Sequence, residues 1–177
     1  MNFYSLILFL HVTAVLTLFA ALAFEALSLF RLRGASEAAE VRLWIDPVPK
    51  LPLTAMGSLL VILFSGIYLM VRISAFDAAW PKVTVAALLI ITPIAAVTGR
   101  RMRAIRQASA LAPAIDSKLR HRLQDPFLKI SLFVRIAIML GIVLLMNAKP
   151  SLWVSIGVVP VSAALGFLLP FFISRRA

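Results

Sequence analysis

The first apolar run of the chain carries two ionisable side chains, His11 and Glu25, among residues that otherwise favour lipid. An imidazole can bind a metal ion, carry a proton or contact a ligand, and a carboxylate can neutralise a cation or carry a proton. At 100° per residue the two side chains come within about 40° of one face of a helix. Ionisable groups in lipid are costly unless they are paired, so both residues are candidates for function.

The elements that must position them are membrane spans. The chain has 177 residues, of which 62% are hydrophobic and 14% charged. A bilayer core of about 30 Å needs about 20 apolar residues in a helix, and five runs reach about that length: residues 3–30, 52–71, 81–99, 127–147 and 151–173. We therefore predict an all-α transmembrane helix bundle in a single membrane domain, residues 1–177, with a four-helix core and an added fifth helix.

Positive charge is concentrated on one side of these predicted spans. The chain has 18 Lys and Arg and a net charge of +11. Most of the basic residues follow the first span, lie in the loop at residues 100–126, or end the chain at Arg175 and Arg176. The positive-inside rule then predicts that these charges face the cytoplasm, with the N-terminus outside and the C-terminus in the cytoplasm. We expect anionic lipid headgroups, and not nucleic acid, as the partner of this charge.

The basic loop at residues 100–126 contains three apolar residues at helical spacing, Ile115, Leu119 and Leu123. They could form an amphipathic helix that lies on the headgroups of the bilayer. They could equally belong to a solvated loop, and the spacing does not decide between these two interpretations.

Glu25 has a potential partner in the fourth span. Arg135 lies eight residues past Phe127, which places it about 12 Å from the inner edge, and Glu25 is about 8 Å from that edge. These depths predict an ion pair that joins the first and fourth spans. Snorkelling of Arg135 to the interface, or a role in binding a ligand or carrying protons, are the alternatives.

His11 lies near the midplane and has no second histidine on its side, because His121 is in the basic loop. Methionine could serve as a further ligand of haem iron or of copper. Met139 and Met146 follow Arg135 on one stripe of the fourth span, and Met70 ends the second. The alternative is a buried histidine that hydrogen-bonds a hydroxyl or a carbonyl group, with methionine as ordinary packing.

Other chemistries find no support. The chain has no cysteine, which excludes disulfides, thiolate metal sites and covalent haem attachment. It also lacks the motifs of zinc hydrolases, serine hydrolases, P-loop proteins and dinucleotide-binding domains.

Four segments of the chain carry a family resemblance. They are "LHVTAVLTLFAALAF", "MGSLLVILFSGIYLM", "AWPKVTVAALLII" and "RIAIMLGIVLLMNAKP". In this order they resemble the four-helix core of a bacterial superfamily that includes copper-resistance D-like proteins and J-type protoporphyrinogen IX oxidases. The residues that carry the resemblance are His11, Gly66, Trp80, Lys82, Arg135, Lys149 and Pro150. It implies a protein of the bacterial inner (cytoplasmic) membrane in which His11 and Lys82 are tied to activity and to haem b, with Lys82 near a propionate or substrate carboxylate. Ile138 and Met139 replace a polar pair of the oxidases, which points to an uncharacterised branch.

Three functions follow as hypotheses. The first is a haem- or porphyrin-associated redox protein centred on His11, which as an enzyme would be a membrane oxidoreductase. The second is a copper or small-solute transport protein that uses the polar residues of the first and fourth spans. The third is a non-catalytic accessory subunit whose ion pair specifies packing. We expect a homodimer, since a five-helix unit has little interior for a macrocycle.

Overall fold

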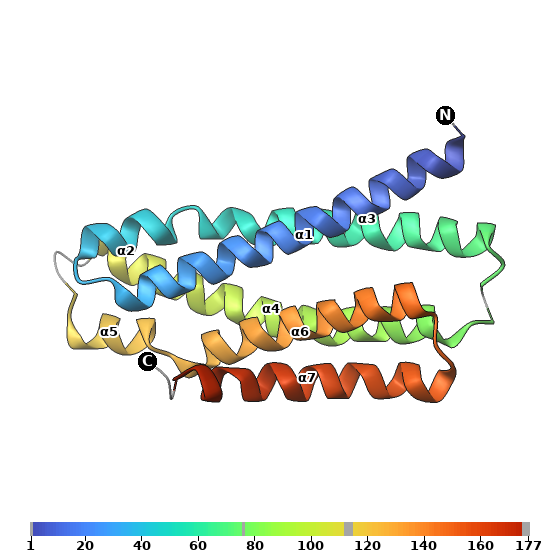
Figure 1. Ribbon diagram of the computed structural model, residues 1–177. Helices are drawn as coiled ribbons and strands as arrows, with labels where there is room; N and C mark the ends of the chain where they lie inside the picture. The colour runs from blue at the N-terminus through green and yellow to red at the C-terminus, as the bar shows by residue number, and fades with distance from the viewer. Residues whose placement is uncertain (1, 76, 112–114, 175–177) are drawn as a thin grey trace.

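The computed structural model describes residues 2–75, 77–111 and 115–174, and its regular elements are helices (Figure 1). Arg175 and Arg176, which were expected to add positive charge at the C-terminus, lie outside the described residues. The five long helices are α1 (Phe3–Gly34), α3 (Leu51–Arg72), α4 (Ala79–Leu111), α6 (Pro126–Ala148) and α7 (Leu152–Ser174). The short elements are α2 (Ala38–Ile45), the 3-10 helix η1 (Val48–Lys50) and α5 (Ser117–Leu123).

All five long helices are long and apolar enough to cross a membrane. Many of their large apolar side chains are exposed on the surface of the protein, among them Leu16, Phe64 and Leu89. In a bilayer such side chains contact lipid, so a spanning helix needs no polar face, and its backbone groups are satisfied within the helix. The predicted all-α bundle with five spans is confirmed, and the chain is a multi-pass membrane protein.

The two ends of the bundle differ in structure. At one end, which we call the basic end, α2, η1 and α5 cover the ends of the long helices (Figure 1). At the opposite end lie the start of α1 and the connections from α3 to α4 and from α6 to α7. There α1 diverges from α4 and α6 and stays close to α3 alone (Figure 1). Space inside the bundle is therefore expected at the opposite end.

The basic end is closely packed and held by polar contacts. Arg106 Nε lies 3.1 Å from Asp46 Oδ1, Arg101 pairs with Asp125, and Arg33 donates to the carbonyl of Gln124 at 3.1 Å. The apolar side chains beneath these contacts form one buried cluster: Leu29, Leu32, Ala35, Val41, Ile45, Val48, Met102, Ile105, Leu119, Leu123, Leu128 and Leu132.

The prediction of a loop over residues 100–126 was wrong about where the loop begins. The helix α4 continues to Leu111, because Met102 and Ile105 are buried one turn apart while the arginines point elsewhere. The rest of the loop contains a helix, α5, as the first interpretation expected, but the apolar side of that helix packs on the bundle. Leu119 and Leu123 of α5 are 2% and 3% exposed, so they pack into the protein and do not lie on lipid or in water.

Candidate functional site

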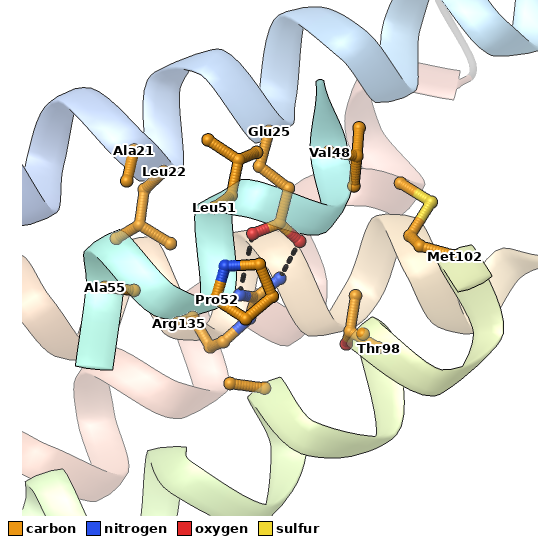
Figure 2. A pocket seen from close by; sticks show the side chains of 12 residues that line it. Ala21, Leu22, Glu25, Val48, Leu51, Pro52, Ala55, Thr98, Met102 and Arg135 are labelled. Atoms are coloured by element: carbon orange, nitrogen blue, oxygen red, sulfur yellow. Dashed lines mark hydrogen bonds and ion pairs between the residues drawn. The ribbon is translucent and has the colours of Figure 1, made fainter. Parts of the chain in front are cut away.

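Glu25 of α1 and Arg135 of α6 form the ion pair that their depths predicted (Figure 2). Arg135 Nη1 donates to Glu25 Oε2 at 2.9 Å, and Nη2 donates to Oε1. Arg135 Nε donates to the carbonyl of Ser131 at 3.2 Å. The arginine is only 4% exposed, so it is held inside the bundle and does not snorkel to the interface. This two-pronged geometry is the strongest form of a carboxylate–guanidinium contact.

A small cavity of about 70 Å³ lies beside this ion pair. Glu25, Arg135 and Thr98 contribute its polar lining, and apolar residues such as Leu51 and Pro52 close it (Figure 2). Thr98 is itself satisfied, since its hydroxyl donates to the carbonyl of Ile94 at 3.0 Å and lies 2.7 Å from Ser131 Oγ. The cavity has room for ordered water, but its polar groups already have protein partners. This arrangement suits a structural role.

His11 is tied to α3 at the opposite half of the bundle. Its Nδ1 lies 2.9 Å from Ser65 Oγ, and the Ser65 hydroxyl also contacts the carbonyls of Val61 and Ile62. A serine hydroxyl has one hydrogen, and the carbonyls can only accept it. When that hydrogen goes to a carbonyl of its own helix, Ser65 accepts from His11 Nδ1–H, and Nε2 is the ring nitrogen that keeps a lone pair. No described side chain binds that nitrogen.

Gly66 fixes the position of the imidazole from the side of α3. A Cβ at this residue would lie 3.4 Å from Cε1 and 3.8 Å from Nδ1 of His11. The Nδ1–Cε1 edge of the ring therefore rests against α3. The two interactions with α3 fix the orientation of the ring, as second-shell groups do for histidine ligands of metals.

His11 also lines a larger cavity, of about 620 Å³, at the end where α1 diverges. This size is within the range of sites for organic ligands. The lining comes from α1, α3, α4 and α6 and is mostly apolar. Its polar or sulfur-bearing residues are Tyr4, His11, Met70, Trp80, Thr84, Met146 and Asn147.

Thr84 is the least expected residue in this lining. It is 4% exposed, and its hydroxyl has no hydrogen-bond partner among the described residues. Thr17, Thr92 and Thr98 each donate to the carbonyl four residues earlier in their helix. Thr84 does not, although it lies in α4 as Thr92 and Thr98 do. Its oxygen is closed off from the cavity as well as from protein partners, as is that of Ser28 on α1, so each hydroxyl costs free energy where it lies.

The predicted ligand residues are only partly brought together. Met70 and Met146 line the large cavity with His11, whereas Met139 is 4% exposed and packs in the core beside Ile138. Lys82 is exposed at the start of α4 and is not among the residues that line the cavity. In the part of the chain that the structure describes, no three His, Asp or Glu residues gather into a metal site.

Sequence reasoning missed Ser65, Thr84 and Asn147. A signal existed for Thr84, because Trp80, Thr84 and Leu88 follow one another at i+4 on α4 and all line the cavity. For Ser65 the only signal was its place next to Gly66, one of the residues that carry the family resemblance. The contact of Ser65 with His11 depends on how α1 and α3 pair.

Comparisons of the chain with models of protein families, with curated proteins and with solved structures gave no match. The class of protein is therefore defined by the fold and the site alone. The chain is a multi-pass, all-helical membrane protein with a buried ion pair near its basic end and a neutral cavity beside His11 at the other.

Proposed function

We propose that this protein binds a lipid-soluble ligand in the cavity beside His11, and that His11 is the residue that contacts it. One observation carries the proposal: an apolar cavity of about 620 Å³ is lined by an imidazole whose Nδ1 and orientation are fixed by α3. A histidine that served packing alone would not need an open space beside it.

The resemblance to the protoporphyrinogen oxidase branch makes haem b the first ligand to test. The donors suit the iron, because His11 offers Nε2 and the thioethers of Met70 and Met146 line the same cavity. Bound haem would supply one-electron chemistry. Its propionates fit less well, because no Lys or Arg is among the described residues of the lining. Lys82, in the first turn of α4 beside the lining residue Pro81, would be the cation that offsets their charge.

The test is the absorption spectrum of the purified protein, oxidised and reduced with dithionite. Haem bound through His11 gives a Soret band that is lost in His11→Ala and kept in His121→Ala. His121 is the matched control, since it is the only other histidine and is exposed on α5. Protein that is free of pigment after haem-replete expression would contradict haem binding.

A copper or small-solute transport function is the second candidate. It is favoured by the combination of one imidazole and two thioethers in one cavity, a donor set that suits Cu(I). Copper-dependent growth or uptake should then fall in Met70→Leu and Met146→Leu and stay unchanged in Met139→Leu. Equal behaviour of all three variants would remove copper as the ligand.

The orientation in the membrane is part of the proposal. The positive-inside rule puts the basic end in the cytoplasm of a bacterium, so that the cavity beside His11 opens toward the outer half of the membrane. The chain has no cysteine, which makes single-cysteine labelling direct. A membrane-impermeant maleimide added to intact cells should label Ser74→Cys at the opposite end and spare Ser117→Cys on α5. The reverse pattern would contradict this orientation.

A further inference from the structure

The cavity beside His11 extends over about the depth of one leaflet of the membrane. Its lining runs along α1 from Tyr4 to Leu16, which at the rise of a helix is about 18 Å, and half of a hydrocarbon core of about 30 Å is about 15 Å. Leu16 of α1, Ile67 of α3 and Val85 of α4 line the cavity and are exposed on the surface of the protein. They lie within candidate spans, so in a bilayer they contact lipid. The cavity therefore has the length and the access that an acyl chain of the membrane needs.

The end of the cavity nearest the membrane surface is polar, and we call it the mouth. It is lined by Tyr4 in the first turn of α1, Trp80 in the first turn of α4 and Asn147 in the last turn of α6. No hydrogen bond joins these three side chains to another described residue. The indole can only donate a hydrogen bond, and the amide and the phenol can donate as well as accept. The mouth therefore offers donors to the head group of a ligand.

Three cations flank the mouth in the chain. Arg72, Lys82 and Lys149 each lie one or two residues from a residue that lines the cavity. All three are exposed, and none forms an ion pair with a described residue. They outnumber Asp77, the acidic residue of the connection from α3 to α4. In the orientation proposed above they lie on the outer side, where the positive-inside rule makes cations uncommon, so topology alone does not explain them.

The backbone of Lys149 is a second observation at the mouth. This residue ends α6 in the left-handed region, with φ 46° and ψ 52°. The conformation costs free energy for a residue with a side chain, and glycine is the usual residue there. A lysine in this position, two residues after Asn147, indicates that the cation itself is used.

We propose that the cavity binds an anionic lipid, with its acyl chain along the apolar walls and its acidic head group at the mouth. A carboxylate or a phosphate accepts hydrogen bonds from Trp80 and Asn147, and the cations beside the mouth attract its charge. The acyl chain passes His11 and leaves the cavity toward the bilayer. This inference rests on the proposed ligand-binding function of the cavity, and it requires neither haem nor copper.

Tryptophan fluorescence tests the inference, because Trp80 lines the mouth and a nitroxide near the head group of a lipid quenches a neighbouring indole. The protein has three tryptophans, so two single-tryptophan proteins are made. One keeps Trp80, and the other keeps Trp153, which is 82% exposed on a candidate span and reports probe dissolved in the bilayer. Both are reconstituted in phosphatidylcholine vesicles at about pH 9, at which a carboxylic acid is ionised. They are titrated with 5-doxylstearate and with its uncharged methyl ester.

The inference predicts saturable quenching of Trp80 by the acid and a gradual loss of Trp153 emission without saturation. The acid should half-saturate Trp80 at a concentration about tenfold or more below that of the ester, the effect of a charge-assisted hydrogen bond.

Two triple variants test the cations. Arg72→Gln, Lys82→Gln and Lys149→Gln together should weaken the acid about tenfold and leave the ester unchanged, which separates loss of charge from misfolding. The matched control removes as many exposed cations from the basic end, with Arg100→Gln, Arg103→Gln and Lys118→Gln, and it should change neither probe.

A second pair of probes identifies the acidic head group. Phosphatidic acid and phosphatidylcholine that carry the same doxyl chain are compared on the Trp80 protein. Tighter saturation by phosphatidic acid than by 5-doxylstearate assigns a lipid phosphate, and the reverse assigns a carboxylic acid. Phosphatidylcholine should not saturate the quenching.

The outcomes that overturn the inference are distinct from failure of the proposed function. Equal half-saturation by the acid and the ester, or equal affinity of the two triple variants for the acid, overturns the anionic lipid and leaves ligand binding in this cavity. A Soret band that depends on His11, without saturable quenching of Trp80, does the same. No pigment, no copper effect and no saturable quenching by any probe overturn both.

Discussion

The two polar sites of this protein differ in whether their groups are already satisfied. At the site near the basic end, a full charge pair is buried, all three guanidinium nitrogens of Arg135 have protein acceptors, and about 70 Å³ of space remains. At the site near the opposite end, the groups are neutral, Thr84 has no partner among the described residues, and about 620 Å³ is open. The charged pair is complete without a ligand, whereas the imidazole of His11 lies beside open space with room for one.

The largest effect is expected at the charged site. Glu25→Ala leaves the Arg135 guanidinium buried without its carboxylate, and we expect a loss of about 3–5 kcal/mol in the free energy of unfolding. Reversible unfolding in mixed micelles measures it. Glu37→Ala is the control, because Glu37 makes no side-chain cap bond at the start of α2.

A double variant separates packing from function at the same site. Replacing both charges, with Glu25→Leu and Arg135→Met together, should restore most of the lost stability, because neither charge is left alone. If the double variant is as unstable as Glu25→Ala, the ion pair does more than join α1 to α6. The contrast between the two sites is then weakened.

A smaller effect is expected where α7 touches α6 next to Arg135. A Cβ on Gly166 would lie 2.7 Å from the carbonyl oxygen of Phe133 and 2.7 Å from Cα of Val134. Gly166→Ala should therefore push the helices apart and cost about 1–3 kcal/mol. Gly157→Ala on the same helix meets nothing within 4 Å and should be neutral or gain up to about 1 kcal/mol. Similar melting temperatures for the two variants would contradict close packing in this half.

The smallest effects compare two threonines of α4. Thr98→Val removes a hydroxyl that bonds Ile94 and Ser131, and should cost about 0.5–1.5 kcal/mol. Thr84→Val removes a buried hydroxyl that has no described partner, so the ligand-free protein should be unchanged or slightly more stable. Thermal unfolding of both variants in one detergent tests the difference in sign. A clear loss in ligand-free Thr84→Val would show that this hydroxyl is satisfied.

The sequence predicted the spans and the ion pair for a simple physical reason. An apolar run of about 20 residues must span the bilayer as a helix, and helical rise then gives the depth of each residue, so that Glu25 and Arg135 could be matched. Similar depth alone does not make Glu25 the partner of Arg135. A buried guanidinium needs an acceptor, however, and Glu25 is the acidic residue of the first apolar run.

The cavity could not be predicted in the same way, because it depends on how far α1 diverges from α4 and α6. His11 was identified from its type, and its bond to Ser65 fits the alternative of a histidine that binds a hydroxyl. Lys82 and Met139 were chosen from resemblance and from spacing, and neither lines the cavity. The length of α4 was missed because Met102 and Ile105, which are buried at helical spacing, stand among arginines that made the segment look like a solvated loop.

The most direct test of the central claim, that the cavity beside His11 holds a lipid-soluble ligand, is to extract the protein purified in mild detergent with organic solvent and identify the extract by mass spectrometry. We expect a porphyrin or another lipid-soluble organic molecule in stoichiometric amount from the wild-type chain, and a large loss of it from His11→Ala but not from His121→Ala. Phospholipid alone, in equal amounts from all three proteins, would contradict it.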